Sequence, residues 1–567
     1  MIERLDFSIP PALAAPVAGV NFVEPLRCLS CIDCEMVVNV GLFFDGTKNN
    51  IYSDRPVLGH SNIARLYDAY KDKADDGYFS IYIPGVGTPF PEIGEHGNHI
   101  SGSAFSIGAE SRVLFGLLEV FNSVHSSVFV GRDLFDAKQV KALCGYSTLN
   151  SADIAVLEAL ALGSSLIGDG EKHSLRETFL KTCEKDLEKK LRSKGKPVVK
   201  MCFIDVFGFS RGAAEARVFC QWFAQLLVDE EFSGIPTRLR FLGIIDTVSS
   251  AGYGEGIFGA ITNTTGGHGG WAKSEYLIVH PSVRNCLHQV AMHEVRKNFP
   301  LDEVRINGVL PKNCQEFAYP GAHSDVGGGY EPEELGVSVG NGAVESDAMK
   351  LSQIPLNHML ECAVAAGVPL DIERARQTSH ADVFSVAPVI QRAFDDFLAL
   401  SNMTPRMLCD WMQPYLNWRW QVKDKYVALN HVRRAKLDRD FLLDSNKKFI
   451  RDAELMRYRG SVEKASDFLS QVFDKKPFDL KNPEYRQEEL SALDPEALAV
   501  LQKAQQAEPV PPALAEFFDN FVHDSLAGFR KDLVEVTGYW RYRRGFRGDA
   551  APTIVSVDRA DQSSEQT

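Results

Sequence analysis

Short apolar segments alternate with helix-like segments from residue 36 to about residue 330, and this alternation limits the folds open to the chain. The strand-like segments cover residues 36–44 (MVVNVGLFF), 78–83 (YFSIYI), 197–207, 238–245 and 314–319. The first two are nearly unbroken apolar runs, as expected for strands buried on both faces of a parallel sheet. The helix-like segments cover residues 106–124, 152–167, 175–192 and 213–227. Strands separated by helices predict βαβ units, and therefore an α/β fold with an open, mostly parallel sheet flanked by helices.

The pattern changes after about residue 332. From residue 348 to 506 it is mostly helical and charged, with expected breaks at Pro369, Pro405, Pro414, Pro477 and Pro483. A proline-rich linker around residues 509–512 precedes an amphipathic helix expected over 517–536. We therefore predict an N-terminal segment (1–34), an α/β-hydrolase-sized domain (35–335), a large helical cap or docking region (336–508), a C-terminal helix that packs back on the core (509–550) and a disordered tail (551–567).

The charge balance excludes a polyanion-binding protein. The chain has 61 Lys and Arg against 75 Asp and Glu, a formal net charge of −14, whereas nucleic-acid binding depends on cations that neutralise phosphates. We therefore expect no nucleic-acid partner. One dense basic cluster lies near the C-terminus, but it is too small to change this expectation: Arg541, Arg543, Arg544 and Arg547.

The sequence predicts neither a membrane span nor a cleavable signal peptide. No run of about 18 uncharged apolar residues is present. Glu3 and Asp6 stand where a signal peptide needs positive charge, and prolines break the apolar stretch that follows. If the protein leaves its cell, we expect a route that does not use such a signal.

Cys28, Cys31 and Cys34 form a C-x2-C-x2-C pattern that resembles part of a metal site. A zinc site needs a fourth ligand, and neither a second CxxC nor an HxxxH lies nearby. We therefore favour small buried thiols in front of a strand, and we expect no metal and no cofactor.

The strongest chemical motif is GFSRG, at the junction between the strand-like segment 197–207 and the helix-like segment 213–227. A nucleophilic serine in this context sits on a sharp turn whose crowding excludes side chains two residues on either side. The turn lifts the Ser210 hydroxyl above the sheet, and the backbone N–H of Arg211 points at the same place as an oxyanion donor. The alternative is a purely structural role, in which the motif is a tight glycine-rich turn and the serine caps the next helix.

A serine nucleophile needs a histidine base and a carboxylate, which follow it in the order Ser, acid, His in this kind of fold. Asp246 ends a strand-like segment, where ligand-facing groups of an open α/β sheet belong, although an acid after a later strand is also common. His323 follows another strand in the glycine-rich sequence YPGAHSDVGGGY, and it is our candidate base. His523 also fits the order and is the rival, but its helical surroundings favour a supporting role.

The sequence FDGT, which ends the first strand-like segment, offers a second oxyanion donor. We expect the backbone near Gly46 or Thr47 to supply it. Asp45 then either fixes this loop by hydrogen bonds or caps the next helix, and the sequence leaves both roles open.

Taken together, VGLFFDGTKNN, GFSRGAAEAR, IIDTVSSAG and PGAHSDVGGGY resemble the catalytic domain of the type VI secretion system lipase effectors, first family, over residues 36–330. The resemblance implies an α/β-hydrolase fold with Ser210, Asp246 and His323 as a triad. It also implies an antibacterial phospholipase (A1 or A2 type) that hydrolyses glycerophospholipid acyl esters. Its implied partners are a phospholipid membrane surface, a secretion spike protein or adaptor, and a cognate immunity protein. It would be cytoplasmic in the producer and delivered into the periplasm of the target cell.

The sequence leaves other functions open. A soluble esterase or thioesterase would use the same residues without an interface, and a non-catalytic adaptor would keep the fold without needing the three site residues. Residues 252–271 (GYGEGIFGAITNTTGGHGGW) combine glycines with apolar side chains, as expected for a lid or membrane-contact loop, or for an ordinary flexible surface loop.

Overall fold

The fold is known here from a computed structural model, which describes residues 35–97, 102–145, 149–168, 171–249, 270–296, 299–379, 381–400, 408–455, 495–528, 543 and 545–546. The cysteine triplet near residue 30, nearly all of the glycine-rich loop 252–271 and the predicted tail lie outside the described residues. The predicted domain boundaries stay predictions.

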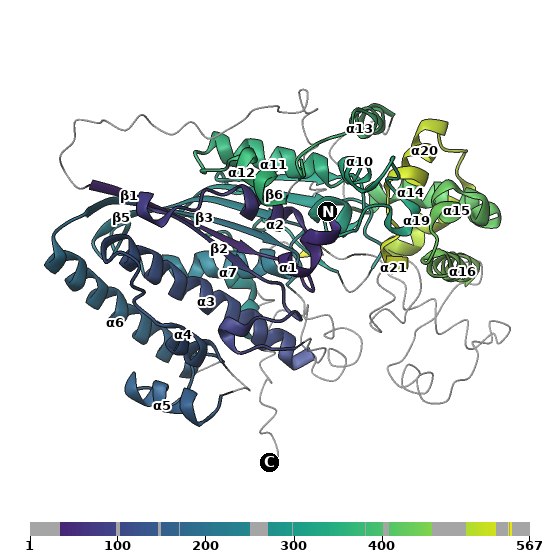
Figure 1. Cartoon of the computed structure of the whole chain (residues 1–567). Coiled ribbons are helices and arrows are strands. Elements are labelled where there is room, and N and C mark those ends of the chain that lie inside the picture. Colours follow the sequence, from purple (N-terminus) through teal and green to yellow (C-terminus); the bar gives the residue numbers. More distant parts are fainter. Residues whose placement is uncertain are drawn as a thin grey trace, which may run out of the picture.

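A seven-stranded sheet forms the centre of the molecule (Figure 1). Six strands pair in parallel, as expected for an α/β fold built from βαβ units, and a two-residue strand pairs antiparallel with the start of one of them. In spatial order the parallel strands are β2 (Tyr78–Ile83), β1 (Glu35–Phe44), β3 (Val198–Phe209), β5 (Ile235–Ile245), β6 (Val283–Ala291) and β8 (Cys314–Tyr319), and β4 (Glu231–Phe232) pairs with β5.

The five predicted strands are all present, and the predicted fold class is confirmed. The sequence analysis missed β6, the strand between β5 and β8. Its apolar run is interrupted by His288 and Gln289, which are completely buried and hydrogen-bonded to neighbouring elements. Polar residues that find partners inside the protein do not carry the apolar signature of a buried strand.

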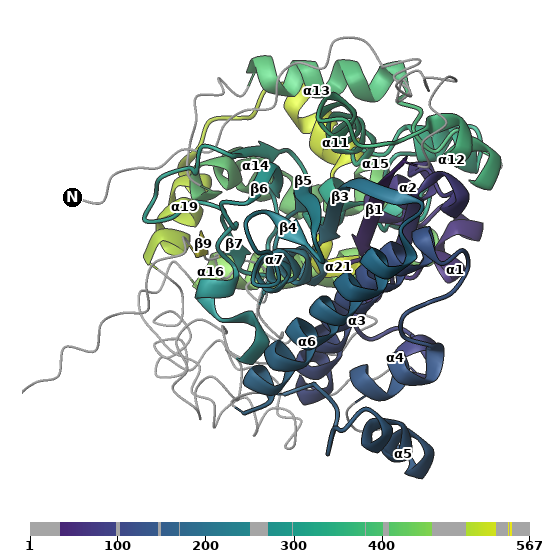
Figure 2. The ribbon, with the colours of Figure 1, turned by 90° about the vertical axis from the view of Figure 1, so that its left-hand side faces the viewer.

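Helices cover both faces of the sheet (Figures 1 and 2). On one face lie α3 (Gly102–Val128), α4 (Ala137–Cys144), α5 (Ser151–Ala159), α6 (Glu171–Lys194) and α7 (Arg211–Ala224). On the other face lie α2 (Asn62–Ala69), α10 (Ala343–Ala348), α11 (Gln353–Ala365), α12 (Ile372–Ser379) and α13 (Pro388–Leu400). The predicted helix over residues 152–167 is shorter than expected, because α5 ends at Ala159 and Ala161 adopts a left-handed conformation (φ 58°).

Further helices gather beyond the carboxyl ends of the strands, on the right of Figure 1. They are α14 (Leu408–Val422), α15 (Asn430–Arg434), α16 (Arg439–Leu455), α19 (Pro495–Gln506), α20 (Pro512–Phe521) and α21 (Ser525–Gly528). Their apolar side chains belong to the same buried cluster as one face of the sheet, with Phe518 of α20 and Leu416 of α14 fully buried. The C-terminal helices therefore continue the hydrophobic core of the α/β sheet.

Two helical predictions need correction. Pro414 lies inside α14 and does not break it; the helix packs beside α19, and Gln413 donates a hydrogen bond to the Val500 carbonyl. The amphipathic helix expected over 517–536 is also wrong: α20 ends at Phe521, and the next residue, Val522, has an extended backbone.

Short elements complete the site region: α1 (Ile51–Asp54), α9 (His323–Gly327), and a two-stranded parallel pair of β7 (Leu301–Asp302) with β9 (Gly545–Phe546). Among the helices described, none combines the length and apolar character needed to cross a bilayer.

Candidate active site

Ser210 occupies a strained turn between β3 and α7. Its backbone torsions are φ 57° and ψ −122°, a conformation that costs a non-glycine residue free energy and is typical of functional turns. A Cβ atom on Gly208 would lie 2.3 Å from the Gly212 carbonyl oxygen, and one on Gly212 would lie 2.2 Å from the Phe44 carbonyl oxygen. The crowding predicted from the GFSRG motif is therefore present, and only glycine fits on either side of the serine.

The backbone ties the serine turn to the turn that carries Asp246. The Ser210 N–H donates to the Ile245 carbonyl (2.9 Å), and the Ser210 carbonyl accepts from the Val248 N–H (3.1 Å). Asp246 lies between these two partners and also has a positive φ (44°). The structure thus brings the predicted nucleophile and the predicted acid together at the carboxyl ends of neighbouring strands, β3 and β5.

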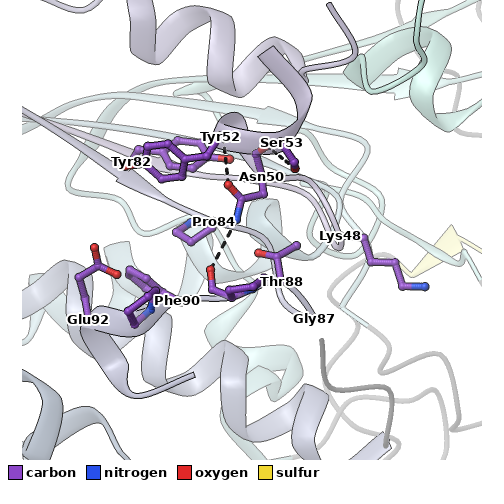
Figure 3. Close-up of a pocket in the computed structure, with 12 residues that line it drawn as sticks. Lys48, Asn50, Tyr52, Ser53, Tyr82, Pro84, Gly87, Thr88, Phe90 and Glu92 are labelled. Carbon is purple, nitrogen blue, oxygen red and sulfur yellow. Dashed lines mark hydrogen bonds between the residues drawn. The ribbon is translucent and has the colours of Figure 1, made fainter. Parts of the chain in front are cut away.

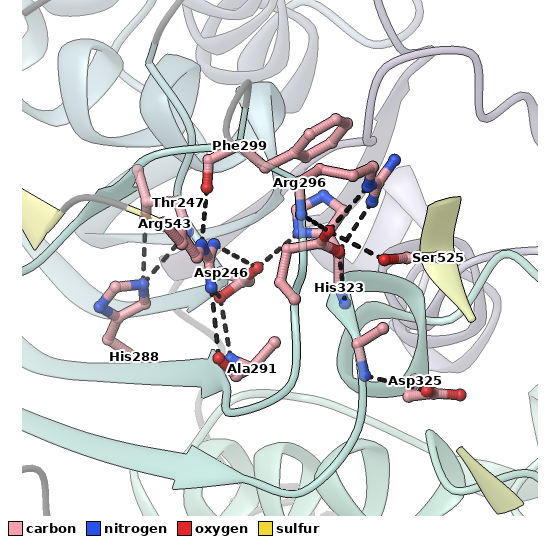
Figure 4. Close-up of polar contacts among 12 residues, drawn as sticks. Asp246, Thr247, His288, Ala291, Arg296, Phe299, His323, Asp325, Ser525 and Arg543 are labelled. Carbon is pink, nitrogen blue, oxygen red and sulfur yellow. Dashed lines mark hydrogen bonds and ion pairs between the residues drawn. The ribbon is translucent and has the colours of Figure 1, made fainter. Parts of the chain in front are cut away.

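His323 meets Asp246 directly. Its Nδ1 lies 2.5 Å from Asp246 Oδ2 (Figure 4), and since the ionised carboxylate can only accept, Nδ1 carries the proton. The imidazole packs between Phe209 and Phe299, with ring centroids 4.6 Å and 5.0 Å away. This packing fixes the ring beside Phe209, the residue before Ser210. Nδ1 makes the contact with Asp246, so Nε2 takes no part in that contact.

Asp246 is fully buried and accepts four hydrogen bonds. Besides His323, its donors are the Ala291 N–H (2.8 Å to Oδ1) and both terminal nitrogens of Arg543 (2.9 Å to Oδ1 and 2.6 Å to Oδ2). Burial alone would raise the pKa of Asp246, but the Arg543 guanidinium and His323 outweigh it and hold this pKa well below its usual range. Burial lowers the pKa of His323, partly opposed by Asp246. At neutral pH the pair is therefore a carboxylate beside a neutral imidazole.

Arg543 and Glu294 were not predicted as site residues. Arg543 belongs to the C-terminal basic cluster, 297 residues from Asp246, and no local pattern links the two. Glu294, in the loop after β6, accepts from the Arg296 side chain, from the His323 N–H (3.2 Å) and from Ser525 Oγ (2.9 Å). Burial acts to raise the pKa of Glu294, but Arg296 outweighs it and lowers this pKa. Glu294 therefore anchors the start of α9 as an anion.

His523, the rival base, has a different partner. Its Nδ1 lies 2.5 Å from Asp325 Oδ1, its N–H donates to Asp325 Oδ2 (3.0 Å), and its ring stacks on Tyr330 with centroids 3.8 Å apart. Asp325 belongs to the same short helix as His323. His523 thus supports the helix that carries the candidate base, in keeping with the predicted supporting role.

The Gly46 amide is not available to an oxyanion, which corrects one prediction. It donates to the side chain of its own neighbour, Asp45 Oδ1, at 2.8 Å. Thr47, the other candidate, lies beside the serine turn, since its Oγ1 accepts from Arg211 Nε at 2.7 Å. The Arg211 backbone N–H begins α7, at the positive end of the helix. The two remaining candidate donors are therefore the amides of Arg211, at the start of α7, and of Thr47, in the loop after β1, and a side-chain hydrogen bond joins these two residues.

Asp45 fixes the loop after β1. Its carboxylate accepts from the Gly46 N–H, from Ser61 Oγ (2.5 Å) and from the Tyr82 hydroxyl (2.5 Å). Burial raises the pKa of Asp45 to about 6. The alternative role as a helix cap is wrong, because Asn50 caps α1 and Ser61 caps α2.

A pocket of about 890 Å³ opens beyond this loop (Figure 3). It begins at Lys48, one residue after Thr47, and its wall is partly aromatic. Lining residues include Tyr52, Tyr82 and Phe90, and Glu92 lies at the end away from Lys48 in the view shown. The pocket therefore offers apolar and charged surface on the loop that also carries Thr47.

This arrangement suits nucleophilic acyl transfer. A strained serine at a helix N-terminus, a neutral histidine and a buried carboxylate are the groups that such a reaction uses. Within the described part of the chain, no three His, Cys, Asp or Glu side chains are grouped as ligands for a metal ion.

Residues 224–362 match the family model of the Tle1-like catalytic domain of type VI secretion system (T6SS) phospholipase effectors. The family resemblance inferred from the sequence is confirmed by this match. The matched span contains Asp246 and His323, and Ser210 lies before it. No curated protein matches the chain.

Two solved structures are similar to this one. The crystal structure of an uncharacterized protein from Pseudomonas aeruginosa has a TM-score of 0.64 and 24% sequence identity, covering 90% of this chain and 80% of that one. This likeness shows a shared fold. A structure of the Tle1 effector bound to the VgrG spike has a TM-score of 0.36 and 18% identity, covering 66% of this chain and 82% of that one.

Proposed function

We propose that the chain, whose residues 224–362 carry a Tle1-like catalytic domain, is a serine hydrolase that uses Ser210, His323 and Asp246. The family gives the general activity, that of a T6SS phospholipase effector. The proposal adds the reaction, which is hydrolysis of an acyl ester of a glycerophospholipid at the first or second glycerol position. The observation that carries it is the buried Asp246–His323 contact beside the strained Ser210 turn.

In the first step, His323 Nε2 takes the proton from Ser210 Oγ as the oxygen attacks the ester carbonyl carbon. Asp246 keeps the Nδ1–H tautomer and stabilises the imidazolium that forms. The backbone N–H groups of Arg211 and Thr47 donate to the oxyanion of the tetrahedral intermediate. His323 then gives its proton to the leaving alkoxide, and a lysophospholipid departs.

In the second step, water attacks the acyl group bound to Ser210, with His323 again acting as base. The free fatty acid leaves and Ser210 is regenerated. Because burial lowers the pKa of His323, the imidazole is neutral at neutral pH and can accept the proton.

The partners and the place of action belong to the same proposal. An effector of this family would be stored in the producer cytoplasm, have a cognate immunity protein, and be delivered with a spike protein or adaptor into the periplasm of a rival cell. Because the chain has a net charge of −14, anionic lipid repels it, and contact with the membrane would depend on local apolar or basic surface.

Product analysis on phospholipid vesicles tests the reaction. Ser210→Ala should reduce fatty-acid release by several orders of magnitude while the fold is kept, because the nucleophile alone is removed. Ser193→Ala, which changes an exposed serine of α6, is the matched control and should keep full activity. Undiminished hydrolysis by Ser210→Ala would refute the assignment, and the products of the wild type would give the acyl position.

A further inference from the structure

We propose that Arg543 is a positioning residue of the candidate triad, whose guanidinium keeps the Asp246 carboxylate ionised and directed at His323. The proposal rests on the proposed function of Ser210, His323 and Asp246. It adds a segment near the C-terminus to a site otherwise built from the α/β sheet and its loops.

The contact between Arg543 and Asp246 is bidentate and buried. The two terminal nitrogens of Arg543 meet the two carboxylate oxygens at 2.9 Å and 2.6 Å, and the side chains are 4% and 0% exposed. Paired N–H donors in a plane fix the orientation of a carboxylate as well as its charge. Oδ2 accepts from Arg543 and from His323 Nδ1, so the arginine sets the position of the oxygen that holds the imidazole.

The rest of the guanidinium is fixed by the backbone of the site. Arg543 Nε donates to the Phe299 carbonyl (2.6 Å), and Nη1 also donates to the Ala291 carbonyl (3.2 Å). Two residues later β9 begins, and it pairs with β7 through Leu301 and Asp302. The pairing of β9 with β7 therefore places Arg543, and its side-chain hydrogen bonds to described residues fall on Asp246 or on backbone next to the site (Figure 4).

The carboxylate needs this cation. A buried, ionised Asp beside a neutral His is costly, because the imidazole supplies a hydrogen bond but no charge. Burial favours uptake of a proton by Asp246, and the charge of Arg543 is the largest effect that opposes it. Without Arg543, the Asp246–His323 pair should bind a proton more tightly, whichever of the two residues carries it.

Among the described residues, the other charged groups near the pair have partners of their own, and Asp302 of β7 accepts from the Ser249 N–H. Glu294 binds Arg296 on the loop after β6, and on α9 Asp325 binds His523. Behind the acid, Thr247 contacts His288, which is paired with Glu316 of β8. These groups stay in place when Arg543 is replaced, so a change in the titration of the catalytic pair is assigned to Arg543.

The test is the pH dependence of kcat/KM for hydrolysis of a soluble short-chain ester. In Arg543→Gln we expect the acid limb to move to higher pH by about one to three pH units, the usual effect of removing a cation in contact with a carboxylate. Arg543→Lys keeps the positive charge but loses the planar pair of N–H donors. In this variant the acid limb should stay close to that of the wild type, while kcat falls about tenfold or more. A purely structural role would lower activity at all pH values and leave the limb in place.

Arg240→Met is the matched control. Arg240 also forms a bidentate pair with a buried carboxylate, that of Asp205 on β3. Asp205 lies in the middle of the sheet, five residues before Ser210, which is about 16 Å along the strand at about 3.3 Å per residue. Losing that pair should destabilise the fold without moving the acid limb. Thermal unfolding of each variant at the assay pH shows which proteins are folded.

An unmoved acid limb in folded Arg543→Gln would overturn the proposal. If Arg543→Gln does not fold, Arg543→Lys decides, and a wild-type kcat in that variant would show that the bidentate geometry is irrelevant. Labelling of the wild type by a fluorophosphonate, located by mass spectrometry, separates the two proposals. A wild type without label on Ser210 would refute the proposed function, whereas a labelled, active wild type with an unmoved limb in the variant refutes the role of Arg543 alone.

Discussion

Gly212→Ala tests the tightest contact of the serine turn. A Cβ atom at this position would lie 2.2 Å from the Phe44 carbonyl oxygen and 2.4 Å from that of Asp45, whereas ordinary contact begins at 3.4 Å. The difference, 3.4 minus 2.2, means that the start of α7 and the end of β1 must separate by about 1.2 Å. Both neighbours are backbone atoms at the buried end of a central strand, so neither can rotate away.

The expected cost has two parts. Forcing extra volume into a packed interior destabilises a protein by about 1–3 kcal/mol. The same separation moves the Arg211 amide away from the Thr47 loop, and a misplacement of about 1 Å in a catalytic site costs about 10²-fold in rate. We therefore expect Gly212→Ala to lower kcat about 100-fold and to lower the free energy of unfolding by about 1–3 kcal/mol.

The assay combines turnover of a soluble short-chain ester with denaturant unfolding of the same preparations. Gly163→Ala is the control, because a Cβ atom there meets nothing within 4 Å and the residue is not left-handed. Wild-type kcat together with wild-type stability in Gly212→Ala would refute both the packing of the turn and the oxyanion role given to the two loops. A loss of stability with unchanged kcat would refute only the oxyanion role.

Three further predictions follow from the buried titratable groups. His523→Ala should destabilise the fold by about 3–5 kcal/mol, because Asp325 loses its buried partner, while kcat of the folded protein falls far less than in His323→Ala; comparable kcat losses would contradict this. Burial raises the pKa of Asp45 from 3.8 to about 6, so its stabilising effect is present below pH 3.8 and is lost as pH rises through 6. Paired denaturant titrations should therefore show the wild type losing about 2 kcal/mol relative to Asp45→Asn between pH 4 and pH 7, and a constant difference would contradict the shift. Because burial lowers the pKa of His323, the acid limb of wild-type kcat/KM should lie below pH 6.5, and a limb above 6.5 would contradict a neutral buried base.

Local patterns were sufficient for most of the sheet. The segment that became β1 is apolar on both faces, and burial between two helical layers leaves this signature. The segments of β3, β5 and β8 were also recognised as strands, although they include the polar residues Asp205, Arg240 and Glu316. The missed strand, β6, carries buried polar groups whose partners lie on other elements. His288 bonds to Glu316 of β8, and Gln289 donates to the Pro355 carbonyl at α11. Partners so distant in sequence leave no periodic trace.

The candidate site also contains residues that a local sequence pattern reveals and residues that only tertiary contacts reveal. Ser210 could be found because a strand, a turn and a helix leave a local motif, and Asp246 and His323 because each follows a strand. The Gly46 error arose from a hydrogen bond between adjacent residues, which depends on the rotamer of Asp45 and not on residue type. Arg543 and Glu294 were missed because their roles come from tertiary contacts alone.

The pairing of β9 with β7 has a consequence for how the protein is made. Asp246 leaves the ribosome 297 residues before Arg543. At a synthesis rate of about 5–20 residues per second, the carboxylate waits roughly 15–60 seconds for its counter-charge, even if the sheet has already formed. Nascent chains that hold the serine, the histidine and the acid still lack the guanidinium. Completion of the candidate site is therefore timed by the synthesis of Arg543 and not by folding of the strands that carry Ser210, Asp246 and His323.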